Sequence, residues 1–373
     1  MIIGVPKEIK NSEYRVGITP GGAKEFINNG HTVIVESKAG EGSGFSDDEY
    51  IKAGCQIYTD VKCLFSDSDM IIKVNKPLPQ EFGLLKKGHI LLCFLYLAPD
   101  LELTEALTKA KIKGIAFETI ELRNGSLPIL RPMSEVAGRM AVQLGANLLQ
   151  KFNGGSGVLL GGVPGVPPAH VTIIGGGIVG KNAAKMAVGL GARVTVLDIN
   201  TTRLAYLDDL FRGRITTLPA SEYNIEKAVK TADLLISGIL IPGCISPIIV
   251  SEQMVKSMKK GSVIIDVSVD HGPSIETVDR ITTHEDPYYI KHGILHYSVD
   301  NMAGAFPRTS TMALEAAILP YGLMLADLGL ERAVAESDSL LKGLNIYDGH
   351  ITYQGVAESH GLPYVNYNLL RRE

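Results

Sequence analysis

A glycine-rich turn between two apolar stretches constrains the fold of this chain more than any other feature. The β-rich run Val171–Ile174 leads into three glycines at the spacing G-x-G-x-x-G, namely Gly175, Gly177 and Gly180. A helical segment over 181–190 follows, and a second apolar run ends at Asp198. In such a unit the first glycine permits a tight turn. The second lets backbone approach a pyrophosphate, and the third lets the helix pack close to the sheet.

This order of elements predicts a site for a dinucleotide. Its phosphates would bind the free N–H groups at the helix N-terminus, where the helix dipole favours negative charge. Asp198 lies about 20 residues further on, where an acid accepts hydrogen bonds from the adenosine ribose. The carboxylate would repel a 2′-phosphate, so the pattern favours NAD(H) over NADP(H). A nucleotide-binding P-loop is the competing interpretation, but Lys181 is followed by Asn182 rather than Ser or Thr.

Composition bounds the class of protein. The length of 373 residues suggests two domains, and 45% hydrophobic with 20% charged residues is typical of a soluble globular chain. A net charge of −4 argues against nucleic-acid partners. No signal peptide is evident, and no uninterrupted apolar run reaches the ~18 residues of a membrane span. Four cysteines without C-x-x-C spacing indicate reduced thiols in a cytoplasmic protein.

Short apolar runs alternate with helical segments along the whole chain, which predicts an α/β fold with parallel sheets. We expect two Rossmann-like, doubly wound domains, with the cofactor domain inserted into the substrate domain. The predicted boundaries place 1–127 and 306–373 in the substrate domain and 128–305 in the NAD-binding domain. A long helix is expected to open at Met133 with Ser134 as its N-cap, and Pro320 is expected to kink or interrupt a later helix.

Several stretches of the chain resemble NAD-dependent alanine dehydrogenases, of the alanine dehydrogenase/pyridine nucleotide transhydrogenase family. They are Glu13–Pro20, Pro132–Gly138, the glycine-rich turn, Val267–Asp270 and Asp300–Met302. The resemblance implies reversible oxidative deamination of a small L-amino acid with NAD, by default L-alanine to pyruvate and ammonium. It also implies a homo-hexamer of two-domain subunits.

The resemblance assigns roles to individual residues. Arg15 would bind the substrate carboxylate, a task that suits a planar guanidinium. Asp270 would lie beside the nicotinamide and take part in proton transfer. Ser134 would contact the nicotinamide side. Further positions would line the dinucleotide: Ile178, Val179, Arg203, Ile239, Leu240, Val267, Arg280, Asn301 and Met302.

The chain departs from the family pattern at two positions close to the expected chemistry. Where these dehydrogenases have a substrate-binding Lys, this chain has Asn75, and where they have a catalytic His, it has Tyr96. Asn can donate a hydrogen bond but supplies no charge. Tyr can move a proton, but its ordinary pKa is about 10 instead of about 6.5. Lys73, on the same face of its strand as Asn75, is a candidate to restore the charge.

The departures leave alternatives to an amino-acid dehydrogenase. One is an imine reductase that forms a secondary amine on a different amino acid, and another is an NAD(H)-binding protein with little catalysis. A soluble transhydrogenase component is a third. A metal site is not expected: His292 and His296 have helical i,i+4 spacing, but the β-like run 294–299 argues against a helix there.

Overall fold

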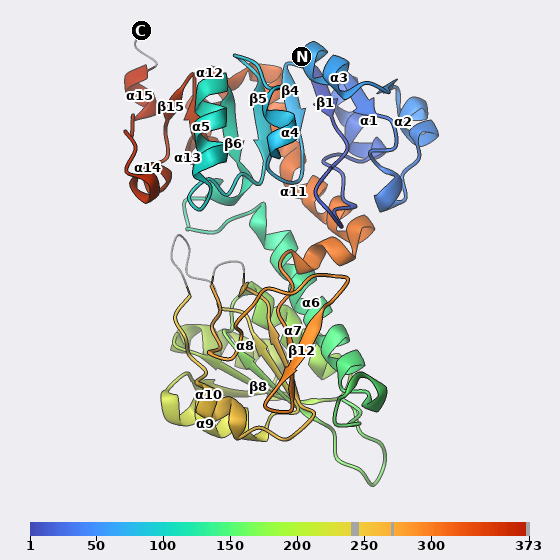
Figure 1. The fold of residues 1–373 in the computed structure, drawn as a ribbon, viewed down its shortest axis with the longest axis vertical. Helices are drawn as coiled ribbons and strands as arrows, with labels where there is room; N and C mark the ends of the chain where they lie inside the picture. The colour runs from blue at the N-terminus through green and yellow to red at the C-terminus, as the bar shows by residue number, and fades with distance from the viewer. Residues whose placement is uncertain (240–245, 270–271, 371–373) are drawn as a thin grey trace. The chain divides into compact units, whose positions relative to one another are not determined.

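The computed structural model describes residues 1–239, 246–269 and 272–370 (Figure 1). The chain forms two compact units. Unit 1 comprises Met1–Met133 and Gly304–Glu373, and unit 2 comprises Ser134–Ala303, so unit 2 is inserted into unit 1. The first boundary lies six residues later than the sequence-based one, and the second lies two residues earlier.

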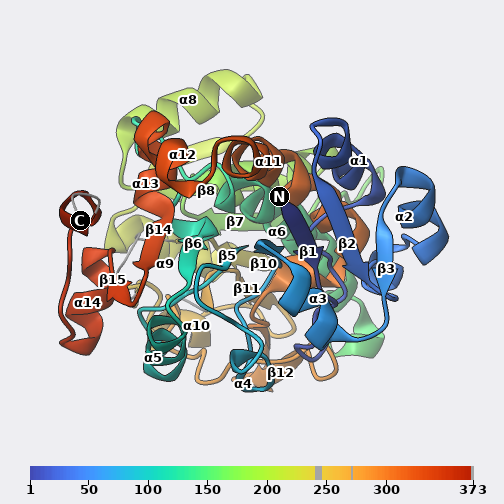
Figure 2. The same cartoon turned by 90° about the horizontal axis from the view of Figure 1, so that it is seen from above.

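Unit 1 contains an eight-stranded sheet in the order β15-β14-β6-β5-β4-β1-β2-β3, which Figure 2 shows running from left to right. Strands β1 to β6 are parallel, and β14 and β15 are antiparallel additions at one edge. The strands are β1 (Ile2–Val5), β2 (Thr32–Glu36), β3 (Gln56–Tyr58), β4 (Met70–Ile72), β5 (Ile90–Cys93), β6 (Lys113–Ala116), β14 (Leu344–Tyr347) and β15 (His350–Ile351). Their buried β-branched and leucine side chains are typical of strands covered on both faces.

Helices cover both faces of this sheet: α1 and α11 lie on one side and α3 and α5 on the other (Figure 2). The helices are α1 (Pro20–Asn28), α2 (Asp47–Ala53), α3 (Val61–Asp67), α4 (Pro79–Phe82), α5 (Leu101–Ala110), α11 (Pro307–Leu328), α12 (Leu330–Glu336), α13 (Asp338–Gly343), α14 (Gln354–His360) and α15 (Tyr367–Leu370), with short 3₁₀ turns at Glu41–Ser43 and Phe117–Thr119. Local sequence explains several starts. Thr19 caps α1 by accepting from the backbone of Gly21 and Gly22, and Ser46 forms a capping box with Glu49.

Helix α11 is not interrupted at Pro320, so that part of the sequence-based expectation is wrong. Proline removes one backbone hydrogen bond, whereas buried Ile318 and Leu325 on either side hold the helix in the core. Within the described part of the chain, α11 is the one helix whose length and composition would allow it to cross a membrane. It also hydrogen-bonds within unit 1, since Thr311 accepts from the backbone of Val16 at 3.2 Å.

Unit 2 contains a seven-stranded sheet in the order β12-β13-β11-β10-β7-β8-β9, parallel except for the edge strand β12. The strands are β7 (His170–Ile174), β8 (Arg193–Asp198), β9 (Thr216–Pro219), β10 (Leu234–Ser237), β11 (Val263–Asp266), β12 (Tyr288–Lys291) and β13 (Ile294–Tyr297). The helices are α6 (Leu130–Leu148), which begins in unit 1, α7 (Ile178–Gly189), α8 (Thr201–Phe211), α9 (Glu222–Thr231) and α10 (Glu252–Lys256), with 3₁₀ turns at Lys151–Asn153 and Met302–Ala305.

Alternate residues of these strands point into two separate apolar cores. Ile173 packs with residues of α6, α7 and α8 on one face, and its neighbour Ile174 packs with α9 and α10 on the other. A sheet with helices on both faces is a doubly wound α/β arrangement. The expected fold class, two Rossmann-like α/β domains, is therefore confirmed.

The start of α6 corrects one local prediction. The helix begins at Leu130, so Ser134 lies inside it and is not its N-cap. Pro132 occupies the first turn, where a proline is tolerated because its missing N–H would have no partner in the helix.

Candidate active site

The predicted substrate residues of unit 1 follow three strands whose carboxyl ends share one edge of the sheet. Arg15 lies in the loop after β1, Asn75 follows β4 and Tyr96 follows β5. The chain runs outward from β1 to β3 and then returns to β4 on the other side of β1. The strand order therefore reverses between β1 and β4, and ligands of open α/β sheets bind at the point where the order reverses. The topology thus brings these side chains to the place where a small molecule is expected.

Arg15 is held from one side by a carboxylate. It is 3% exposed, and its Nε and Nη2 donate to the two oxygens of Glu13 at 2.7 and 2.6 Å. Asn75 Nδ2 donates to Glu13 Oε2 at 2.6 Å. Burial alone would raise the pKa of Glu13, but Arg15 and Asn75 together lower it to about 2. The guanidinium is therefore fixed in orientation, and its Nη1 faces Met133 Sδ at 3.3 Å.

A second buried network lies beneath this pair. Lys73 is fully buried, 2.7 Å from Glu81 and 3.4 Å from Glu8. Glu8 also accepts from the backbone of Val74 and Asn75, at 2.7 and 3.2 Å. Burial is the largest effect on Glu8 and raises its pKa, whereas the charge of Lys73 lowers it by less. Lys73 is thus paired with two carboxylates, which argues against the expectation that it supplies a charge to the substrate in place of Asn75.

Tyr96 occupies a turn with an uncommon backbone conformation, φ 44°. Its ring stacks on Phe94, with centroids 5.7 Å apart and planes 10° from parallel. Burial lowers the pKa of Arg15, whereas Glu13 and, to a smaller degree, Tyr96 raise it. Unit 1 therefore places Arg15, Asn75 and Tyr96 at the same carboxyl edge of its sheet.

The glycine-rich turn of unit 2 has the geometry expected of a phosphate-binding loop. Gly175 has φ 94°, a conformation that favours glycine. A Cβ on Gly180 would lie 1.8 Å from the Gly175 carbonyl oxygen, so only glycine fits there. A Cβ on Gly177 would meet no atom within 4 Å, and Gly177 is the residue before α7. The turn thus leaves an open approach to the helix N-terminus, between β7 and β10, where the chain reverses direction across this sheet.

Asp198 and Arg203 lie side by side at this turn. Asp198, at the end of β8, accepts from the backbone N–H of Gly176 at 2.6 Å and of Asn200 at 2.8 Å. Arg203 donates to the carbonyl oxygens of Gly176 and Gly177 at 2.5 and 3.0 Å. Both residues therefore support the shape of the turn as well as standing where the ribose is expected.

The other predicted dinucleotide residues have varied surroundings. Ile178 and Val179 begin α7, and the Val179 carbonyl lies against Gly138 of α6. Ile239 and Val267 are partly buried beside the two cores, whereas Met302 is 3% exposed within one of them. The Arg280 guanidinium lies 3.9 Å above the Tyr289 ring, Asn301 has φ 52°, and Ser134 lies inside α6. Leu240 and Asp270 lie outside the described residues.

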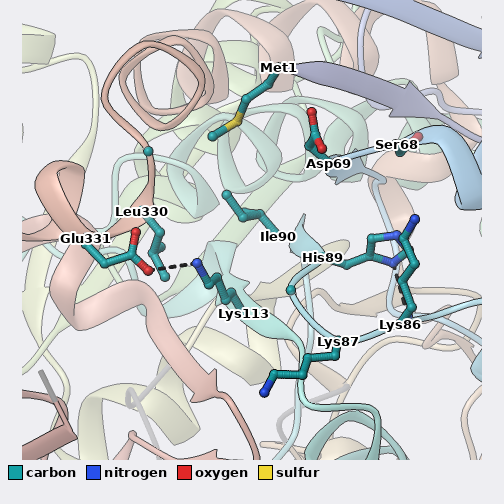
Figure 3. Close-up of a pocket in the computed structure, with 12 residues that line it drawn as sticks. Met1, Ser68, Asp69, Lys86, Lys87, His89, Ile90, Lys113, Leu330 and Glu331 are labelled. Carbon is teal, nitrogen blue, oxygen red and sulfur yellow. Dashed lines mark hydrogen bonds and ion pairs between the residues drawn. The ribbon is translucent and has the colours of Figure 1, made fainter. Parts of the chain in front are cut away.

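A hollow of about 500 Å³ lies at the opposite, amino-terminal edge of the unit 1 sheet (Figure 3). It is lined by residues that precede or begin strands, including Met1, Asp69 and His89. Lys113, at its wall, is paired with Glu331 at 2.7 Å. Since Arg15, Asn75 and Tyr96 follow the carboxyl ends of the strands, this hollow is separate from the candidate active site.

Sequence reasoning missed three carboxylates that organise the site, Glu8, Glu13 and Glu118. Glu118 accepts from the backbone of Leu95 and Tyr96, and Glu13 orients Arg15. One signal was present in the sequence for two of them: Glu8 and Glu118 closely follow apolar strands of a parallel sheet, at the edge where ligands bind.

The comparisons with known proteins agree with this geometry. The model for the N-terminal domain of alanine dehydrogenase/PNT matches residues 4–137, and the model for the C-terminal domain of alanine dehydrogenase/PNT matches residues 141–354. Alanine dehydrogenase of Methanococcus maripaludis is 58% identical over 364 residues, which are 98% of each chain. Alanine dehydrogenase of Staphylococcus haemolyticus is 54% identical over 366 residues, again 98% of each chain.

Solved structures show the same relationship. An L-alanine dehydrogenase superposes with a TM-score of 0.94 at 48% identity, covering 97% of this chain and 99% of that one. A transhydrogenase from Sinorhizobium meliloti shares the fold, with a TM-score of 0.79 at 23% identity over 95% of this chain and 99% of that one. The chain belongs to the alanine dehydrogenase/PNT family.

Proposed function

We propose that this protein is an NAD-dependent oxidoreductase that acts on the CH–NH₂ group of a small L-amino acid. L-alanine is the default substrate, and the products are pyruvate, ammonium and NADH. The observation that carries the proposal is the buried Arg15, fixed by Glu13 beside Asn75 and Tyr96 at the carboxyl edge of the unit 1 sheet. The family relatives named above are alanine dehydrogenases, which supports the same activity.

The residues of unit 2 fit the dinucleotide that this reaction requires. The space beside Gly177 and the N-terminus of α7 suit a pyrophosphate, and the Asp198 carboxylate suits ribose hydroxyls. We assign Ile178, Val179, Arg203, Ile239, Leu240, Val267, Arg280, Asn301, Met302 and Ser134 to the same task by family resemblance. When bound, NAD supplies the acceptor for the hydride that leaves the substrate Cα.

The side chains of unit 1 would bind the substrate and move protons. Arg15 would hold the carboxylate, because Glu13 fixes the orientation of its planar guanidinium. Tyr96 would exchange a proton with the amino group or the water that replaces it, favoured by the positive charge of Arg15 nearby. Asp270 would share this proton chemistry.

We further propose that Asn75 and Tyr96 stand where relatives carry a lysine and a histidine. The contact between Asn75 and Glu13 supports this, because a lysine ammonium at position 75 would face the same carboxylate. The pocket would then bind its substrate with one charge fewer. No contact among the described residues favours an imine reductase or a protein that only binds NAD(H). A cytoplasmic homo-hexamer, without nucleic-acid or membrane partners, remains the expected state.

A rate screen tests the proposal. NADH formation is followed with NAD and a panel of L-amino acids, and the reverse reaction with NADH, ammonium or primary amines and a panel of 2-oxo acids. The expected result is turnover with L-alanine and pyruvate plus ammonium. Tight binding of NADH without turnover on any member of either panel would overturn it, and turnover only with primary amines would favour the imine reductase.

A further inference from the structure

The turn that carries Tyr96 is held at its most unusual point by one carboxylate. Glu118 Oε2 accepts from the N–H of Leu95 at 3.1 Å, and Glu118 Oε1 accepts from the N–H of Tyr96 at 2.6 Å. The two oxygens of one side chain therefore engage consecutive backbone donors. Glu118 reaches them from the short 3₁₀ turn Phe117–Thr119, directly after β6, the strand next to β5 in the sheet.

The backbone conformation of Tyr96 needs such support. A residue with a Cβ adopts the left-handed region only at a cost in free energy, and Tyr96 has φ 44°. Such a conformation persists where the surrounding contacts over-determine it. Hydrogen bonds to a charged acceptor are stronger than neutral ones, so two of them can offset the cost.

The residues on either side of Tyr96 are fixed independently. Phe94 N–H donates to the Val74 carbonyl oxygen at 3.0 Å, which extends the pairing of β5 with β4. The Leu97 carbonyl oxygen lies 2.9 Å from His360 Nε2 and 3.2 Å from Thr104 Oγ1. Neither set of contacts acts on the φ angle of Tyr96 itself. The contacts of Glu118 fall at the residue where the chain adopts the unusual angle.

We propose that Glu118 is the positioning residue for Tyr96: its carboxylate fixes the left-handed turn and thereby sets the direction of the phenol. The inference rests on the proposed function only for its effect on rate, because the effect on the turn exists without turnover. The two bonds are fully charge-assisted only where Glu118 is ionised, which its raised pKa places above neutral pH. Burial raises the pKa of Glu118 to about 7, opposed by the backbone donors of the turn and by Lys76, which is itself paired with Asp100 at 2.6 Å.

Hydrogen–deuterium exchange tests the structural half in the full-length protein, resolved to the amides of residues 95 and 96. Glu118→Ala removes both acceptors, and we expect these amides to exchange roughly tenfold or more faster. Glu118→Gln keeps one oxygen acceptor and should give an intermediate rate. If Glu118→Ala fails to fold, the Glu118→Gln comparison decides alone. Exchange at residues 95 and 96 that matches wild type in a folded variant would overturn the inference.

A matched control exists in the same unit. Asp47 Oδ1 accepts from the N–H of Lys38 at 2.8 Å, and Lys38 also has a left-handed backbone, φ 65°. Asp47→Asn should change exchange near residue 38 and leave residues 95 and 96 as in wild type. If Asp47→Asn accelerated exchange at 95 and 96 equally, the effect of Glu118 would be general loosening, and the inference would fail.

A double-mutant cycle tests the catalytic half. In wild type, Glu118→Gln should lower kcat with little change in KM for the amino acid, because Arg15 still holds the carboxylate. In a Tyr96→Phe background, the same substitution should have no further effect on kcat, since the group that it positions is gone. Equal losses in both backgrounds would show that Glu118 acts on something other than Tyr96. Absence of all wild-type turnover would contradict the proposed function but leave the exchange result to stand by itself.

Discussion

Glu13 accepts two parallel hydrogen bonds from the guanidinium of Arg15, 2.7 Å from Nε to Oε1 and 2.6 Å from Nη2 to Oε2. Both side chains are almost fully enclosed. A buried arginine with this partner has one orientation instead of many. The relationship turns a flexible side chain into a fixed anchor.

The first prediction concerns this anchor. Glu13→Gln removes the charge that fixes Arg15, and we expect KM for the amino acid to rise roughly tenfold or more, the size of one charge-assisted hydrogen bond. The folded-state pKa of Glu13 is about 2, below its ordinary value. Its contribution to stability is therefore present above about pH 4.5 and lost as the pH falls toward 2. Glu336→Gln, in an exposed pair with Arg332, is the control and should change neither quantity.

The glycine-rich turn could be predicted from the sequence because its constraints are local. The spacing of Gly175, Gly177 and Gly180 requires a strand, a turn and a helix in that order, and all three were found. The start of α6 could not be read from Ser134, because Pro132 fits an earlier helical turn equally well.

Contacts between residues far apart in the sequence could not be predicted from it. Glu118 accepts from a donor 22 residues away, and no periodicity reports such a pair. The edge strands β14 and β15 are short and come from the far end of the chain. The sequence therefore supplied candidate binding residues, which stay predictions, and did not supply the acids that orient them.

The second prediction separates folding from binding at the glycine-rich turn. Gly177→Ala should leave the melting temperature unchanged, because its Cβ meets no protein atom within 4 Å, but should weaken NADH binding at least tenfold by intruding on the pyrophosphate. Gly180→Ala should destabilise the fold by about 3 kcal/mol or more, since its Cβ would lie 1.8 Å from a carbonyl oxygen. Calorimetric titration and thermal melting of both variants give the two readouts. Equal NADH affinity in Gly177→Ala and wild type would show that the pyrophosphate does not bind at this turn.

The third prediction concerns the charge balance around Asn75. Burial raises the pKa of Glu8 above its ordinary 4.5, so the folded protein binds a proton more tightly than the unfolded one. The stability that Glu8 contributes is then fully present below about pH 4.5 and declines as the pH rises through the raised pKa. Asn75→Lys would place an ammonium beside Glu13 and Glu8, lower the pKa of Glu8 and make this decline shallower.

Melting temperatures between about pH 4 and pH 8 check this prediction, with the neutral Asn75→Gln as control. An unchanged slope in Asn75→Lys would contradict it. Combined with Tyr96→His, the same change should raise kcat/KM for L-alanine, because it supplies a cationic donor and a base with an ordinary pKa near neutrality.

The fourth prediction concerns acid stability. His296 is fully buried, bound to Thr277 at 2.8 Å, and burial lowers its pKa to about 4. The unfolded chain binds a proton at this residue near pH 6.5 and the folded chain does not, so stability is lost as the pH falls from about 6.5 to 4. His296→Gln should flatten that loss, whereas His350→Gln, at an exposed position, should not. An identical acid slope in wild type and His296→Gln would show that His296 is not responsible.

The most direct measurement of the central claim is the fate of the hydrogen on the substrate Cα. L-alanine deuterated at C2 is incubated with NAD and the protein, and the reduced dinucleotide is analysed by mass spectrometry. Direct hydride transfer predicts NADH that carries the deuterium, formed together with pyruvate and ammonium. Unlabelled NADH, or no NADH from L-alanine or any other labelled amino acid, would contradict the account.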